Sequence, residues 1–238
     1  MNAESRTFSY GDENFEFRLK RCDRKTLAIS VKPDLTIEVV APLGASLEKI
    51  FEKVKKRAPW IRKQVRYFIQ FQPRTPHRQY VAGETHLYLG RQYKLKVIRH
   101  IEQRVKLYRG RVIIQSLRPR DTENTKKLVE DWYRERAHIK FRERLIICQQ
   151  RFPAPEQFSP QGLVVKQLRQ RWGSMTPSGK LILNRALIRS SVDAIDYVIT
   201  HELCHLRHNN HGTYFFQLLD RVMPDWEKRK IRLERQLA

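Results

Sequence analysis

Residues 201–211 read HELCHLRHNNH, and this segment constrains the fold more than any other part of the chain. His201 and His205 are four residues apart, so their side chains lie on one face if the segment is an α-helix. Two neutral imidazoles at that spacing can bind a zinc ion, and Glu202 beside them can accept a proton from zinc-bound water. The segment therefore predicts a helix that carries a catalytic metal site.

The residues before the motif support a helix over 193–208. Ser190 and Asp193 resemble a capping box, which would begin that helix. Apolar residues then recur at helical spacing and predict a buried face: Ile195, Val198, Ile199 and Leu206. Glu202 falls within this face, where a carboxylate is costly unless a cation compensates it. A metal ion held by the neighbouring histidines would be that cation.

A catalytic zinc site needs a third protein ligand and one open position for water. His208 continues the helical face, but three ligands from one straight helix converge poorly on a single ion. His211 follows Asn209 and Asn210, which tolerate the left-handed conformation and can end a helix. Gly212 comes next and permits a sharp turn. We therefore expect His211 to be the third ligand and His208 to be a solvated histidine in the last helical turn.

Two other interpretations of the motif are weaker. A bare H-E-x-x-H also arises by chance as a polar helix face, but here the cap, the buried glutamate and the third histidine agree with one another. The spacing from His201 to His211 also fits the metzincin pattern H-E-x-x-H-x-x-G-x-x-H. That pattern requires glycine where this chain has His208, so the metzincin assignment ranks second.

At these residues the chain resembles the YgjP-like and SprT-like zinc metallopeptidases. After H-E-L-x-H, the matching blocks are Asn210-His211-Gly212-Thr213-Tyr214-Phe215, Arg169-Gln170-Arg171-Trp172-Gly173-Ser174-Met175 with Gly179 and Leu183-Asn184, and Pro224-Asp225-Trp226. The amino-terminal half matches at Lys25-Thr26-Leu27, Pro59-Trp60-Ile61 and Gly83-Glu84. The resemblance covers most of the chain, and the YgjP-like branch is the closer match.

The resemblance implies one zinc ion held by His201, His205 and His211, with Glu202 as the base. Members often carry cysteine after Trp-Gly-Ser, where this chain has Met175, so no metal role is assigned to that position. The resemblance implies no particular substrate.

Composition bounds the location of the protein. A chain of 238 residues with 40% hydrophobic residues can form one large domain or two small ones. Its first residues do not resemble a signal peptide, and no apolar segment approaches the length of a membrane span. The three cysteines, Cys22, Cys148 and Cys204, are scattered and odd in number, which is typical of a reducing compartment. We expect a cytoplasmic protein with no membrane span.

The net charge is the second clue to partners. Lysine and arginine number 48 against 25 aspartate and glutamate, which leaves a formal charge of +23. Such an excess predicts attraction to nucleic acid, nucleotides or other polyanions. The basic residues are spread along the whole chain, and no basic run interleaved with aromatic residues occurs. We therefore expect non-specific binding of polyanions and no reading of base sequence.

Periodicity predicts an α+β fold. Strands are expected at 15–19, 27–31, 37–39, 87–89, 93–97, 105–107, 112–114, 163–168 and 180–183. Helices are expected over 46–71, either kinked or divided at Pro59, and over 122–152, 193–208, 212–222 and 225–236. We expect an amino-terminal, mainly antiparallel β domain with a helix over 1–118, and a zincin-like helical domain with a small sheet over 119–238. No internal repeat is visible, and strand 163–168 or 180–183 is expected to pair with an extended substrate.

Three functions fit these features. The first is a zinc metallopeptidase in which Glu202 assists the attack of zinc-bound water on a peptide bond. The second is metal-dependent hydrolysis of nucleoside triphosphates such as UTP, although no Gly-rich phosphate loop or acidic two-metal cluster is visible. The third is a non-catalytic polyanion-binding protein with structural zinc, against which Glu202 and the open ligand position argue. Arg171 and Tyr214 are candidates for contacts to the substrate or the oxyanion.

Overall fold

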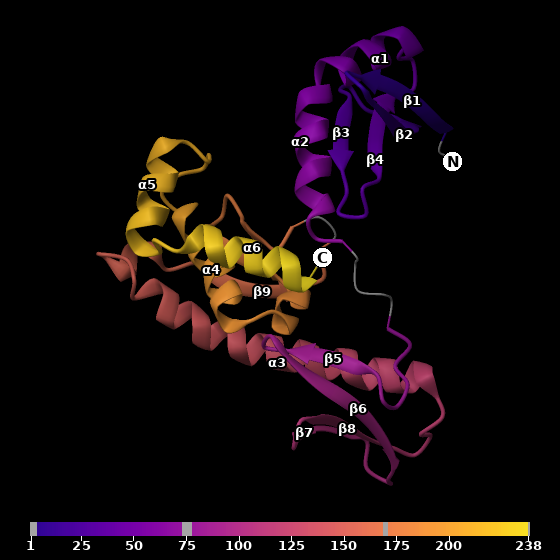
Figure 1. The fold of residues 1–238 in the computed structure, drawn as a ribbon. Helices are drawn as coiled ribbons and strands as arrows, with labels where there is room; N and C mark the ends of the chain where they lie inside the picture. Colours follow the sequence, from indigo (N-terminus) through magenta and orange to yellow (C-terminus); the bar gives the residue numbers. More distant parts are fainter. Residues whose placement is uncertain (1–3, 73–77, 169–170, 238) are drawn as a thin grey trace. The chain divides into compact units, whose positions relative to one another are not determined.

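The computed structural model describes residues 4–72, 78–168 and 171–237, and it confirms the α+β fold class (Figure 1). Arg169 and Gln170, part of a family-like block, lie outside the described residues. The chain divides into two compact units, within residues 1–75 and 76–237. None of the described helices is both long and apolar enough to cross a membrane.

The first unit is a mixed four-stranded sheet with two helices. Its strands pair in the order β1-β2-β4-β3, with β2 parallel to β4 and the other neighbours antiparallel. The elements are β1 (Glu4–Tyr10), β2 (Glu13–Cys22), β3 (Ala28–Val31), β4 (Ile37–Pro42), α1 (Leu47–Lys56) and α2 (Ala58–Ile69). Alternate residues of the sheet form a separate core with the helices, including Phe17, Val39, Ile50, Val54 and Ile61.

The helix expected over 46–71 is divided, which is one of the two predicted alternatives. Ser46 caps α1 by accepting a hydrogen bond from the backbone N–H of Lys49, and α1 ends before Arg57. Pro59 lies in the first turn of α2, where its missing N–H costs no helical hydrogen bond. Proline therefore begins the second helix and does not kink a single long one.

The second unit opens with a sheet of the same design. Its strands are β5 (Thr85–Tyr88), β6 (Arg91–Arg99), β7 (Arg104–Tyr108) and β8 (Arg111–Ser116). They pair in the order β5-β6-β8-β7, again with only the second and third neighbours parallel. Arg109 and Gly110 both have positive φ, as in the tight two-residue turn of a hairpin, and they connect β7 to β8. The two sheets thus repeat one topology that sequence periodicity did not reveal.

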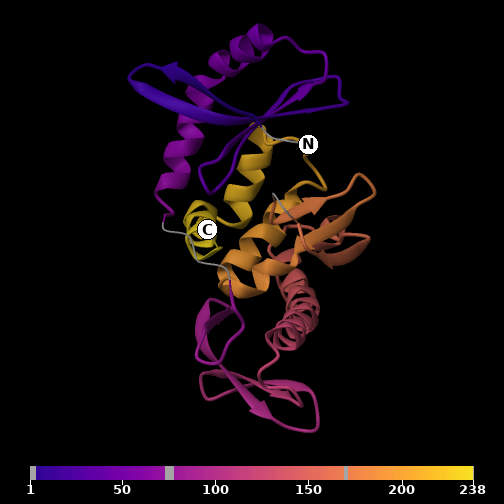
Figure 2. The ribbon, with the colours of Figure 1, turned by 90° about the vertical axis from the view of Figure 1, so that its right-hand side faces the viewer.

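The long helix α3 (Thr122–Gln149) follows this sheet and organises the rest of the unit. Figures 1 and 2 both show α3 between the sheet β5–β8 on one side and α4 on the other. The remaining strands, β9 (Gly162–Lys166), β10 (Gly173–Met175) and β11 (Lys180–Asn184), form a sheet in the order β10-β11-β9. Helices α4 (Val192–Cys204), α5 (Thr213–Val222) and α6 (Trp226–Leu237) complete the unit.

The division of the chain differs from the boundary expected at residue 118. Leu95, Val112 and Ile114 of the sheet β5–β8 share one hydrophobic core with Val129 and Trp132 of α3. Because this sheet packs directly against α3, residues 76–118 belong with the carboxy-terminal part. The strand pattern showed the sheet but not the helix on which its apolar face is buried.

Candidate metal centre

Helix α4 carries the H-E-x-x-H motif, but it begins and ends at other residues than expected. Its first residue is Val192 and its N-cap is Ser191, whereas the Ser190 hydroxyl donates to the backbone oxygen of Leu187. The expected capping box at Ser190 is therefore wrong, and Asp193 forms an ion pair with Arg232. The helix ends at Cys204, four residues before the expected end at 208.

The chain turns back towards α4 by a different route from the predicted one. The backbone N–H of His208 donates to the oxygen of Cys204 at 3.0 Å, which closes a last turn directly after the helix. Asn209 and Asn210 do not adopt positive φ, and Gly212 has φ −87°. The left-handed turn expected at Asn209 and Asn210 is absent, and one further turn of backbone hydrogen bonds over 204–208 follows the helix.

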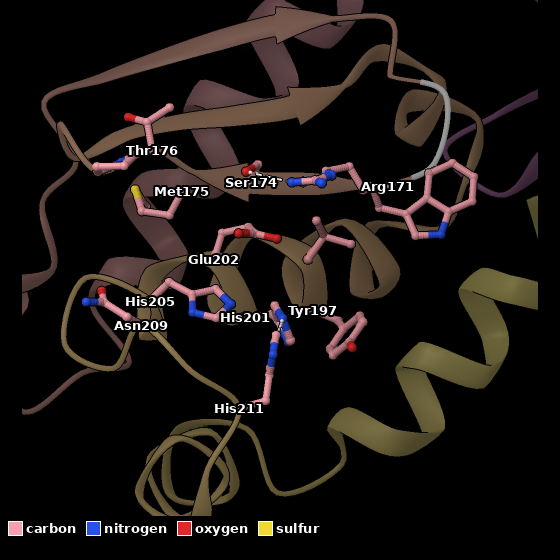
Figure 3. A pocket seen from close by; sticks show the side chains of 14 residues that line it. Arg171, Ser174, Met175, Thr176, Tyr197, His201, Glu202, His205, Asn209 and His211 are labelled. Atoms are coloured by element: carbon pink, nitrogen blue, oxygen red, sulfur yellow. Dashed lines mark hydrogen bonds between the residues drawn. The ribbon is translucent and has the colours of Figure 1, made fainter. Parts of the chain in front are cut away.

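This reversal brings three imidazoles together. One nitrogen from each of His201, His205 and His211 lies within 4.8 Å of the others, and Nε2 of His201 is 2.9 Å from Nε2 of His211. Figure 3 shows the three rings pointing towards one another. Nδ1 of His205 lies 2.9 Å from the backbone oxygen of His208. Since a carbonyl only accepts, Nδ1 carries the proton and Nε2 of His205 is left as the ligand atom.

The electrostatics of the cluster favour neutral imidazoles. Burial, followed by the charges of His211 and His205, lowers the pKa of His201 to about 3. Burial also lowers the pKa of His211. Neutral imidazole is the form that binds a metal ion, so the two rings need not lose a proton near neutral pH. Three imidazole nitrogens on one side of an open pocket fit a catalytic zinc ion.

Glu202 lies between the histidines and strand β10 (Figure 3), and only 7% of its surface is exposed. Burial raises the pKa of its carboxyl to about 7, against the lowering effects of a hydrogen bond from the Met175 backbone N–H and of the Arg171 charge. A carboxyl group with a pKa near 7 can both accept and return a proton at neutral pH. The burial predicted for this carboxylate is confirmed.

These side chains open into one pocket of about 720 Å³. One wall is β10, an edge strand of its sheet that was not among the strands expected from the sequence. We expected β9 or β11 to pair with substrate. In the sheet, β11 is the central strand and β9 is the edge strand on the side away from β10. Strand β10 is only three residues long and carries one apolar side chain, Met175, so the sequence shows no alternation that could have predicted it.

The two candidate substrate contacts differ in position. Arg171 lines the pocket, and its guanidinium donates to the Ser174 hydroxyl at 3.4 Å. Tyr214 lies on α5 with 74% of its surface exposed, and it is not among the described residues that line the pocket. Tyr197 and Asn209 do line it, although sequence reasoning missed both. Tyr197 precedes His201 by one helical turn, a spacing that could have identified it.

One known protein family matches most of the chain. The model of the YgjP-like metallopeptidase domain matches residues 25–236, which includes the candidate ligands, Glu202 and β10. No match was found among curated proteins. Since the matched segment spans nearly the whole chain, the protein belongs to the YgjP-like metallopeptidase family.

Proposed function

We propose that this protein is a zinc-dependent metallopeptidase in which His201, His205 and His211 hold one zinc ion and Glu202 is the general base. The observation that carries the proposal is the convergence of three imidazoles and one buried carboxyl in a single open pocket. A structural zinc site is closed by four protein ligands and needs no base beside it. The chemistry of this donor set therefore favours a catalytic site.

Bound zinc in such a site supplies an activated water and polarises the substrate carbonyl. The protein groups then have separate tasks. Glu202 accepts a proton in the pocket and returns it to the leaving amine, for which its raised pKa suits it. Arg171 at the pocket wall is assigned to a contact with the substrate carbonyl or backbone. Tyr214 is assigned no role because it is exposed outside the pocket.

The free edge of β10 offers a place for the peptide. The backbone oxygen of Trp172 accepts from Asn184, and the N–H of Thr176 donates to Lys180, so these groups face β11. By strand alternation the backbone groups of Gly173 and Met175 face the opposite way, towards Glu202. An extended peptide that adds to this edge would pass directly over the carboxylate and the histidines.

The test is the turnover of zinc-loaded protein and its Glu202→Gln variant on fluorescently labelled, unfolded protein substrates. We expect the variant to keep one zinc per chain and to lose activity by about 10²-fold or more, since general-base catalysis contributes on that scale. Tyr214→Phe, outside the pocket, is the control and should retain activity.

The same pair of proteins distinguishes the other two hypotheses. If the Glu202-dependent activity cleaves nucleoside triphosphates and not polypeptides, the metallopeptidase proposal is replaced by nucleotide hydrolysis. If zinc binds but no substrate of either class turns over, the site is non-catalytic.

A further inference from the structure

One face of the sheet β5–β8 concentrates positive charge. Val112 and Ile114 are buried on the side of α3, so the intervening residues of these strands point away from that helix. The register places nine such residues in three rows across β6, β8 and β7: Lys94, Arg111 and Tyr108; Lys96, Ile113 and Lys106; Ile98, Gln115 and Arg104. We call these nine residues the basic face.

The basic face contains five cations and no carboxylate. Lys94, Lys96, Arg104, Lys106 and Arg111 are all exposed. Within the described residues, none of these five has an ion-pair partner. Cations gathered in this way repel one another, so a polyanion that neutralises them is a strongly favoured ligand.

Two carboxylates come near the edge of this face without neutralising it. Asp131 and Glu135 of α3 line a groove that Arg104 and Lys106 also line. Asp131 pairs with Arg134 of its own helix. Tyr108, Ile98, Ile113 and Gln115 of the basic face also line that groove, whereas Lys94, Lys96 and Arg111 do not.

The repeated topology supplies an internal comparison. On the sheet of the first unit, Ile37 and Val39 are buried, so Glu38 lies on the face that corresponds to the basic face. Glu38 pairs there with Lys20 at 3.1 Å and with Lys32 at 2.7 Å. This face of the first sheet therefore carries a carboxylate that pairs with two lysines, whereas the basic face contains no carboxylate.

The basic face also presents an aromatic ring. Tyr108 is 56% exposed, and the guanidinium of Arg109 lies 5.1 Å from the centre of its ring. Ile98 and Ile113, half-buried between the cations, add apolar surface. Single-stranded nucleic acid needs this combination, because its phosphates contact cations while unpaired bases stack on an aromatic or apolar surface.

We propose that the basic face binds single-stranded nucleic acid without reading its sequence, the cations contacting phosphates and Tyr108 stacking on a base. The cations would also attract an acidic protein, but binding of an acidic protein would not explain the exposed ring of Tyr108. The proposal concerns a surface on the other side of α3 from the candidate metal centre, and it does not depend on the peptidase proposal.

The test measures the anisotropy of a labelled oligothymidylate of about 20 nucleotides, longer than a single-fold binding site, with the full-length protein. Lys94→Glu/Lys96→Glu is compared with Lys55→Glu/Lys56→Glu, which changes the net charge equally in an exposed basic run of α1. We expect the first variant to lose at least tenfold in affinity. Its plot of log affinity against log salt should be shallower by about 1.4, because each contact to a single strand contributes about 0.7.

Further variants define what the surface recognises. Tyr108→Ala should weaken binding of the single strand about fivefold or more, the usual range for loss of base stacking. Duplex DNA of the same length should bind less tightly and should not respond to Tyr108→Ala. If the unfolding curve shows that the glutamate variant is misfolded, Lys94→Gln/Lys96→Gln replaces it, because this variant adds no negative charge. It should also lose affinity for the oligonucleotide, but by a smaller factor.

Three results would overturn the proposal. One is an equal loss of affinity in both charge-reversal variants, which would show attraction by net charge alone. Another is absence of binding to the oligonucleotide at about 0.15 M salt. The third is binding of polyglutamate or of phosphatidylserine vesicles through the same lysines when the oligonucleotide does not bind.

Discussion

The backbone at Gly173 passes so close to Glu202 that a larger residue cannot occupy this position unchanged. A Cβ atom there would lie 2.7 Å from Cγ and 2.9 Å from Oε1 of Glu202, and 3.0 Å from Cγ1 of Val198. Real Cβ atoms do not approach neighbours this closely, so the glutamate would have to move. Gly173 thus fixes where the carboxylate lies relative to the histidines.

We therefore predict that Gly173→Ala lowers kcat for the proposed peptidase reaction by about 10²-fold, the cost expected when a catalytic group is displaced by roughly 1 Å. The zinc content should stay at the wild-type value, because the three histidines are not touched. Steady-state kinetics and metal analysis check both parts.

Gly162→Ala is the matched control, since it lies in the same sheet and nothing lies within 4 Å of its added Cβ. Equal activity of the two alanine variants would mean that Gly173 does not position the base.

At the residue scale, the sequence predicted which side chains lie close together when they are separated by one helical turn or by a short loop. The spacing of His201, Glu202 and His205 is a property of any helix, so the burial of Glu202 followed from its place in the apolar face. The contact between Gly173 and Glu202 joins a strand to a helix, and no periodicity reports such a contact. Tyr214 was chosen for its chemistry and its closeness to His211 in sequence, but neither property determines whether its side chain points into the pocket.

At the element scale, a buried carboxylate anchors helix α4. Asp196 is 3% exposed and accepts two hydrogen bonds of 2.7 Å from Arg144, and a third of 2.7 Å from Arg151. Arg229 of α6 lies 3.9 Å from the same carboxylate. Asp196 therefore joins α4 to α3, to the turn that follows α3 and to α6, and it lies just over one helical turn before His201.

We predict that Asp196→Asn lowers the free energy of unfolding by about 3 kcal/mol, because three arginines would lose their shared anion in a largely buried setting. Urea denaturation followed by circular dichroism measures the change.

Asp193→Asn removes a carboxylate of the same helix whose partner, Arg232, is mostly exposed. That control should change the free energy of unfolding by less than about 1 kcal/mol. Similar losses in the two variants would contradict a special role for Asp196.

The existence of most elements followed from the sequence, whereas some of their ends and partners did not. Helices 212–222 and 225–236 were expected within one residue of α5 and α6, since both have clear apolar stripes. The end of α4 was not predicted correctly, because the turn that follows it is formed by backbone hydrogen bonds, which the side-chain pattern does not indicate. Strand β1 was not expected at all, since its residues are mostly polar and it is held by pairing with β2.

At the scale of the whole molecule, the chain contains two separate hydrophobic cores. The candidate metal centre belongs entirely to the second unit. A ligand that binds only the folded form raises the free energy of unfolding of the unit that binds it. The increase is about 2.7 kcal/mol when the free ligand concentration is a hundred times Kd.

We predict that calorimetry resolves two unfolding transitions and that chelation of zinc lowers only one of them, by on the order of 5–10 °C. Fluorescence assigns that transition to the second unit, which contains Trp132, Trp172 and Trp226, whereas the first contains Trp60. The His211→Ala variant should show the lower transition with or without chelator. A single transition that shifts as a whole would mean that the two cores unfold together.

Each of the three sheets is built from one short segment of the chain: β1–β4 from residues 4–42, β5–β8 from 85–116 and β9–β11 from 162–184. Each sheet can therefore form soon after its own strands leave the ribosome, without waiting for distant segments. The histidine cluster is different, because it is encoded after residue 200 and depends on α4 being held by α3 and α6. During synthesis, metal capture by this cluster would therefore follow the formation of all three sheets, whose strands precede it in the chain.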